Sequence, residues 1–202
     1  MDELVPVRGS FGTKEFLIGP LRPQEHPATF KLSSGLNITE SGWRSLLAAE
    51  NVVGAKSPDS SIVGLHIANH YSLIYEGEQL RQLRAAASVL CNRFKLDQSS
   101  IAFGSQSVIV PEFTITDLRE HLLRSLLRTV GFRYRHLFSF CRKNDPEELE
   151  TLQLQGWRCY QEEDDVCYLM LNVAKTLRGL ASQLVLRIPP RPQMVARATG
   201  TR

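Results

Sequence analysis

Apolar residues recur along the chain with two spacings, one typical of strands and one typical of helices. The clearest strand pattern alternates apolar and polar positions from Val63 to Tyr75, so one face of this segment is apolar. Shorter apolar runs that stop at glycine, proline or acidic residues have the length of buried strands. The segments predicted as strands are 14–18, 52–56, 63–75, 101–110, 136–141, 157–160 and 166–171.

Apolar residues spaced by three and four positions predict amphipathic helices between these strands. The strongest stripe occupies residues 118–130. A helix start is also clear at Asp145, an N-cap residue followed by Pro146 in the first turn, and Gly156 supplies the positive-φ residue that ends this helix. The segments predicted as helices are 39–50, 78–94, 116–130 and 146–156.

This order of elements predicts one α/β domain of the α+β type, with a mixed, mostly antiparallel central sheet flanked by helices. A chain of 202 residues has the usual size of a single domain. We expect a loose N-terminal segment over residues 1–13, the domain over 14–173 and a C-terminal extension over 174–202. The last ten or so residues are expected to be disordered, because they offer little to bury.

Charge and cysteine usage narrow the classes of partner. A formal net charge of +3 is too small to predict a nucleic-acid-binding protein, and no apolar run reaches the ~18 residues of a membrane helix. The acidic start MDELVPVRGSFG is unlike a signal peptide, which predicts a cytoplasmic protein. Cys91, Cys141, Cys159 and Cys167 form no CxxC pair and have no histidine at metal-ligand spacing, so we expect free thiols and no metal.

Two segments carry a resemblance to a known family. The sequence Val108-Ile109-Val110-Pro111-Glu112-Phe113, followed by a helix and a strand, and then the helix from Asp145 to Gly156-Trp157, resemble motifs of the GNAT (GCN5-related N-acetyltransferase) superfamily. The similarity covers residues 14–171 in the order of elements. It implies a GNAT-like fold in which the helix at 78–94 is inserted between the third and fourth predicted strands. It also implies transfer of an acyl group from acetyl-CoA or another acyl-CoA to a small amine.

The resemblance also implies where the donor binds. In this family the donor's pantetheine arm lies between two parallel strands that part, here 101–110 and 136–141, and pairs with the free strand edge. Backbone N–H groups of the following loop and the N-terminus of the next helix hold the pyrophosphate. The residues expected to bind the donor are Val108, Val110, Phe113, Thr114, Ile115, Thr116, Asp117, Leu118, Arg119 and Arg124.

The chain departs from the family pattern at two functional positions. Asp117 and Arg119 stand where the family has glycines; Asp117 suits a helix cap, but its carboxylate repels a diphosphate, by about 1 kcal/mol at ~4 Å in bulk water. The family's tyrosine, which protonates the leaving thiolate, is replaced by Leu152 or Thr151, depending on the alignment. Two functions therefore remain open: an N-acyltransferase, and a GNAT-fold binding or regulatory module without catalysis.

Acyl transfer to an amine needs a base near the attacking nitrogen. His70 and Glu76, at the end of the alternating segment, are the candidate catalytic residues; half-exposed sheet residues would show the same pattern. The basic stretch 119–136 fits a solvated face, a coenzyme A phosphate site or a docking surface for an acidic acyl carrier protein. The inserted helix at 78–94 would cover the acceptor cleft, enlarge an acyl pocket or form a homodimer contact.

Overall fold

The computed structural model describes residues 2–9, 12–35, 40–47, 51–70, 78–104, 107–114 and 116–186. The strands are β1 (Glu3–Gly9), β2 (Gly12–Pro20), β3 (Asn51–Lys56), β4 (Ile62–His70), β5 (Ile101–Gly104), β6 (Val108–Ile109), β7 (His136–Arg142), β8 (Arg158–Glu163) and β9 (Val166–Asn172). The helices are α1 (Glu40–Leu47), α2 (Glu78–Phe94), α3 (Leu118–Val130), α4 (Pro146–Leu154) and α5 (Val173–Leu186). Three 3-10 segments accompany them: η1 (Pro23–Gly35), η2 (Gln98–Ser100) and η3 (Pro111–Phe113).

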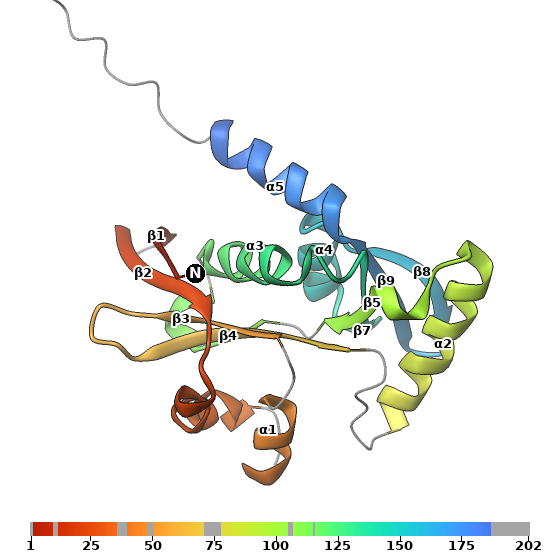
Figure 1. Ribbon diagram of the computed structural model, residues 1–202, viewed down its shortest axis with the longest axis horizontal. Coiled ribbons are helices and arrows are strands. Elements are labelled where there is room, and N and C mark those ends of the chain that lie inside the picture. The colour runs from red at the N-terminus through yellow and green to blue at the C-terminus, as the bar shows by residue number, and fades with distance from the viewer. Residues whose placement is uncertain are drawn as a thin grey trace, which may run out of the picture.

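One sheet organises the molecule (Figure 1). Within the described part of the chain its nine strands run in the order β1-β2-β3-β4-β5-β7-β9-β8, and β6 pairs with β4. All neighbours are antiparallel except β5 and β7, which are parallel. A parallel pair needs a long crossover, and here the crossover contains α3.

Helices cover both faces of the sheet. On one face, Leu126 of α3 and Leu152 of α4 belong to a single buried cluster, which α5 joins through Leu180. On the other face, Trp43 of α1 packs in a cluster at the β3–β4 end and Leu90 of α2 in a cluster at the β7–β9 end. Full burial of such side chains stabilises the fold by roughly 1.5–3 kcal/mol each. The helices on both faces therefore stabilise the sheet.

The structure confirms the predicted fold class, a mixed and mostly antiparallel sheet flanked by helices. Helix α2 has the predicted bounds and lies between β4 and β5, where an insertion was expected. The predicted strand 101–110 is divided into β5 and β6. The predicted strand 63–75 is described only as far as His70, and residues 187–202, including the segment expected to be disordered, lie outside the described residues.

The N-terminal segment differs from the expectation of a loose entry. Residues 3–9 form β1, which pairs with β2 from Glu3↔Ile18 to Gly9↔Gly12. Val5 and Val7 alternate with exposed residues and are buried, and Gly12 adopts φ +89° next to the turn. The first strand therefore extends the sheet at its edge.

Among the described residues, none of the helices has both the length and the apolar character needed to cross a lipid bilayer.

Candidate functional site

Strands β5 and β7 pair over a short distance and then part. The last paired residues are Phe103 and Phe138. The chain then continues as β6, in which Ile109 lies opposite Gly64 of β4. Within the described ranges, segment 139–142 of β7 therefore has a strand partner only on its β9 side. The parting predicted from the resemblance is present and begins before the predicted strand ends.

The backbone of β6 presents its polar groups alternately to β4 and to the gap beside β7. The N–H of Val110 donates to the carbonyl of Val63 at 2.9 Å, so its polar backbone groups face β4. In an antiparallel pair the groups of Val108 point the same way, whereas those of Ile109 point away from β4. The N–H of Val110, one of the expected donor contacts, is therefore used by β4, whereas the backbone groups of Ile109 point the other way.

A buried indole lies at the point where β5 ends. A Cβ placed on Gly104 would lie 3.1 Å from Cη2 of Trp157, so the absence of a side chain here makes room for the ring. Trp157 is 1% exposed, and its Nε1 has no hydrogen-bond partner among the described residues. The ring packs at the end of β5, in the cluster that α3 and α4 share.

Several backbone N–H groups of the loop between β6 and α3 donate hydrogen bonds to acceptors within the same loop. Three N–H groups bond within the loop: Phe113 N to Val110 O (3.0 Å), Thr114 N to Pro111 O (3.3 Å) and Leu118 N to Thr116 Oγ1 (3.2 Å). Thr116 also donates its hydroxyl to the carbonyl of Phe113 at 2.6 Å. A pyrophosphate would need free N–H groups at this place, and these three are occupied.

Asp117 ties the start of α3 to β1. Its Oδ1 accepts the N–H of Arg8 at 2.8 Å, and its own N–H donates to the carbonyl of Arg8 at 3.4 Å. Asp117 is the N-cap residue of α3, as predicted, but its carboxylate makes no capping bond, and Thr116 Oγ1 accepts the Leu118 N–H instead. Oδ2 lies 3.6 Å from His121, whose pKa is lowered mainly by burial, and this favours the neutral imidazole.

The N-terminal ends of α3 and α4 border a cavity of about 420 Å³. Arg119 crosses it and donates to Glu148 at 2.8 Å. Three further carboxylates, those of Glu120, Asp145 and Glu147, line the same cavity. Because its arginine is already paired, this cavity favours cations over the phosphates of coenzyme A.

The overall fold occurs in solved acetyltransferase structures. An acetyltransferase of the GNAT family from Listeria monocytogenes superposes with a TM-score of 0.57 at 8% identity, covering 79% of this chain and 95% of that one. The GNAT domain of S. lividans PAT gives 0.61 at 8% identity, over 85% and 96%. Arabidopsis thaliana NAA60 in complex with acetyl-CoA gives 0.55 at 9% identity, over 79% and 99%.

The protein has the GNAT fold. No family model matches the sequence, and the search of curated proteins finds no similar sequence. At identities of 8–9% the likeness establishes the fold alone, so the chemistry has to be argued from the residues of this chain.

The candidate catalytic bases lie largely outside the described residues. The side chain of His70, all of Glu76 and the loop residue Ile115 lie outside the described residues. His66, which precedes His70 on β4, is buried, and its Nδ1 lies 2.9 Å from Oγ of Ser107. This pair joins β4 to the start of β6, beside the parting. The alternating pattern places His66 on the face of His70, and Ser107 is a candidate cleft residue of the predicted strand 101–110, but their pairing is not visible in the sequence because the two residues lie far apart in the chain.

The basic residues of α3 do not gather on one side of the helix. Arg119 faces α4, whereas Arg124 is close to Arg128 and Glu3, on the side of β1. Five residues along a helix correspond to a rotation of roughly 140°, which separates Arg119 from Arg124. Arg124 is therefore poorly placed to bind phosphates held at the start of α3.

Cys141 lies near the cleft but is unsuited to nucleophilic chemistry. Burial, with help from the Glu148 carboxylate, raises the pKa of its thiol to about 11. The thiolate is the nucleophilic form, and at neutral pH it is almost absent here. Cys141 is a core residue.

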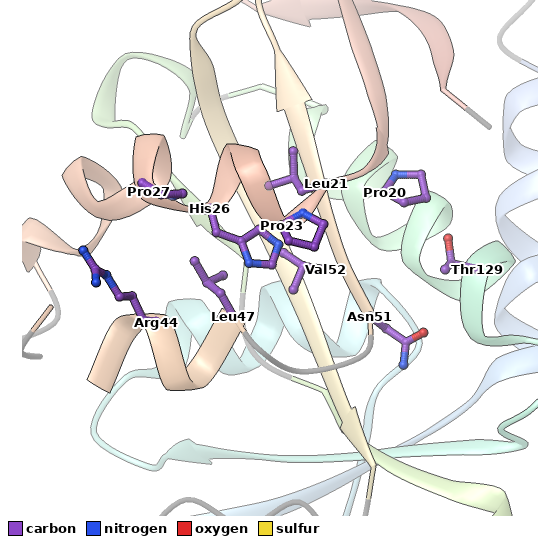
Figure 2. A pocket seen from close by; sticks show the side chains of 10 residues that line it. All are labelled: Pro20, Leu21, Pro23, His26, Pro27, Arg44, Leu47, Asn51, Val52 and Thr129. Carbon is purple, nitrogen blue, oxygen red and sulfur yellow. The ribbon is translucent and has the colours of Figure 1, made fainter. Parts of the chain in front are cut away.

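A second cavity, of about 770 Å³, lies between η1, α1 and the start of β3 (Figure 2). Its described lining is mainly apolar and contains no carboxylate, and Arg44, which reaches it from α1, is paired with Glu40 at 2.5 Å. An apolar group fits this lining better than a charged amine does. The lining residues are Pro20, Leu21, Pro23, His26, Pro27, Arg44, Leu47, Asn51, Val52 and Thr129.

Proposed function

We propose that the protein is an N-acyltransferase whose thioester donor lays its arm between β6 and β7 and passes its acyl group to an amine. The observation that supports this most is the parting of β5 and β7 after Phe103 and Phe138. The gap has the outward N–H and C=O of Ile109 on one side and the open edge of β7 on the other. An amide-containing arm can pair with both, as an added strand would.

The reaction is a direct attack within a ternary complex. The amine nitrogen bonds to the thioester carbon, the carbon–sulfur bond breaks, and the proton of the amine moves through a base to the leaving thiolate. His70 or Glu76 is the proposed base. Neither position of α4 that aligns with the family's tyrosine supplies an acid, because Leu152 is buried and apolar and the Thr151 hydroxyl donates to Glu147 O at 2.8 Å. A single base can take the proton from the amine and then give it to the leaving thiolate, so no separate acid is needed.

Anchoring of the donor relies on the arm more than on the diphosphate. The Asp117 carboxylate, the occupied loop N–H groups and the acidic α3–α4 cavity all oppose a diphosphate. An acyl group on a carrier protein brings the same arm with a single phosphodiester, and this lowers the repulsion. Acyl-CoA and an acyl carrier are therefore both donors to be tested, with a small amine as acceptor.

Thermal unfolding of the full chain tests this proposal. An acyl-pantetheine, which has the arm without the diphosphate, is expected to stabilise the protein, by about 2.7 kcal/mol at 100 times its dissociation constant. ADP, which has the diphosphate without the arm, is the matched control and is expected to have no effect. Stabilisation by ADP and not by the arm would contradict the assignment of the gap. No shift with acyl-pantetheine, acyl-CoA and acyl carrier together would remove the acyltransferase proposal.

Removing the charge at Asp117 is expected to strengthen binding of acyl-CoA. Asp117→Gly restores the glycine of the family motif, and loss of a repulsion of about 1 kcal/mol or more corresponds to a gain of at least roughly fivefold in affinity. Asp117→Asn is the control, because its amide oxygen can still accept the Arg8 N–H. Isothermal titration with acetyl-CoA measures both variants. Equal or weaker binding in both would show that this carboxylate does not face the diphosphate.

A GNAT-fold binding module without catalysis is the second candidate function. The ion pair of Arg119 and Glu148 favours it, because the pair occupies the arginine that could otherwise bind coenzyme phosphates at the start of α3. The two functions differ in one result: a module of this kind binds none of the thioester donors in the unfolding experiment, whereas an acyltransferase binds at least one.

A further inference from the structure

Two thiols and a carboxylate meet at the edge strand of the sheet, far along the chain from the donor loop. The Sγ atoms of Cys159 and Cys167 and a carboxylate oxygen of Glu162 all lie within 4.8 Å of one another. Cys159 and Glu162 belong to β8, and Cys167 belongs to β9. Cys167 is 3% exposed and Glu162 is exposed, so the group runs from the core to the surface.

A β-bulge brings these side chains to one face. In a regular strand, residues three apart point to opposite faces, so Cys159 and Glu162 would be separated by the sheet. The register of β8 against β9 shifts between Cys159 and Gln161, and beyond the shift Glu162 lies directly opposite Cys167. Bulges re-aim side chains in this way and are frequent beside functional sites.

The Glu162 carboxylate is already oriented toward the thiols. Its Oε1 lies 3.9 Å from Sγ of Cys159, while its Oε2 lies 3.0 Å from Nζ of Lys143. Lys143 thus holds the outer oxygen and leaves the inner one directed at the sulfur atoms. Carboxylates that bind metals are commonly fixed by such an outer partner.

We propose that Cys159, Cys167 and Glu162 bind Zn²⁺ or a similarly thiophilic divalent cation, with Lys143 orienting the carboxylate. At Zn–S distances of about 2.3 Å the ligand atoms of a tetrahedron lie about 3.8 Å apart, close to the present arrangement. Thiolates select zinc over magnesium and calcium, which prefer oxygen. Both thiols lose their protons to solvent on binding. Zn²⁺ and the Lys143 ammonium together balance two thiolates and one carboxylate, and water takes the fourth position.

Cys141 is not part of this site. It lies opposite Cys167 on β7, but its Sγ contacts the carbonyl oxygens of Arg142 at 3.5 Å and Asp145 at 4.0 Å. Its thiol is directed toward the start of α4 rather than toward β8. Metal-ligand spacing is missing from the sequence because the ligands come from two strands and one of them is shifted by the bulge.

The test is metal binding by the reduced full-length protein. Co²⁺ is expected to bind once per chain with the absorption of tetrahedral cobalt–thiolate, and Zn²⁺ is expected to displace it. Cys159→Ser leaves one thiolate ligand, so the absorption of the two-thiolate Co²⁺ complex should be lost. Glu162→Gln should weaken Zn²⁺ binding at least tenfold. Cys91→Ala is the matched control: it removes a thiol of α2 that lies in a separate cluster on the opposite face, without placing a hydroxyl in the core, and binding should not change.

Three outcomes would overturn the proposal. Co²⁺ could bind without thiolate absorption, Zn²⁺ affinity could be equal in the protein and in Cys159→Ser, or the reduced protein could bind no Zn²⁺ at micromolar concentrations. Cys167→Ser places a hydroxyl in the core and lowers stability on its own, so Cys159→Ser and the exposed Glu162→Gln are the variants that decide the test.

Discussion

Replacing Trp157 by alanine is expected to lower the free energy of unfolding by about 3–5 kcal/mol, the range for buried aromatic residues. The indole is 1% exposed and belongs to the cluster that joins α3, α4 and α5 to the sheet. Its ring also lies against Gly104, so its loss leaves a cavity where β5 ends. Urea unfolding followed by circular dichroism measures the change.

Two control variants separate packing from other effects. Leu154→Ala, at the end of α4 and 79% exposed, is expected to change stability by about 0.5 kcal/mol or less. Trp157→Phe keeps an aromatic ring and removes an indole N–H that has no partner among the described residues, so it should cost far less than alanine. A small effect of Trp157→Ala, comparable to that of Leu154→Ala, would mean that this indole does not support the parting of the strands.

Ile109→Pro is expected to weaken binding of an acyl-pantetheine at least tenfold, or about 1.4 kcal/mol. Proline removes the N–H that faces the gap, which an arm paired as a strand would use. The ladder with β4 is spared, since Ile109 lies in a pair without hydrogen bonds to that strand. Isothermal titration gives the affinity and urea unfolding gives the stability.

Val110→Pro is the matched variant, and it is expected to lower stability while leaving donor affinity unchanged. The backbone of Val110 already has φ −60°, which proline can adopt, but its N–H donates to Val63. Loss of this bond should reduce stability by about 1 kcal/mol and leave donor affinity nearly unchanged. If instead Ile109→Pro binds the arm normally, the donor does not pair with β6 and the proposed function loses its main support.

The sequence predicts the elements of the fold well wherever the pattern is long. Helix α2 has the predicted bounds, and α3 begins at Leu118, two residues after the predicted start at 116. Long stripes predict well because each residue adds to one periodic signal. The parallel pairing of β5 with β7 followed from the resemblance, since periodicity alone does not determine which strands are neighbours.

The remaining features depend on contacts between distant residues. Strand β1 has only Val5 and Val7 as buried positions, too few for a period to be recognised. The partner of Asp117 is Arg8, 109 residues away, and the partner of Arg119 is Glu148, 29 residues away. The bulge in β8 reverses the alternation on which face assignments rest. None of these is visible in a local pattern.

The bond between Arg8 and Asp117 makes the beginning of the chain sensitive to events at the proposed donor site. Any ligand that displaces the Asp117 carboxylate must break this bond and release the Arg8 amide to water. Hydrogen exchange at that single amide would therefore report occupancy, even for a donor that is never turned over. It also means that truncations within the first strand would disturb Asp117, so affinities are best measured with this strand intact.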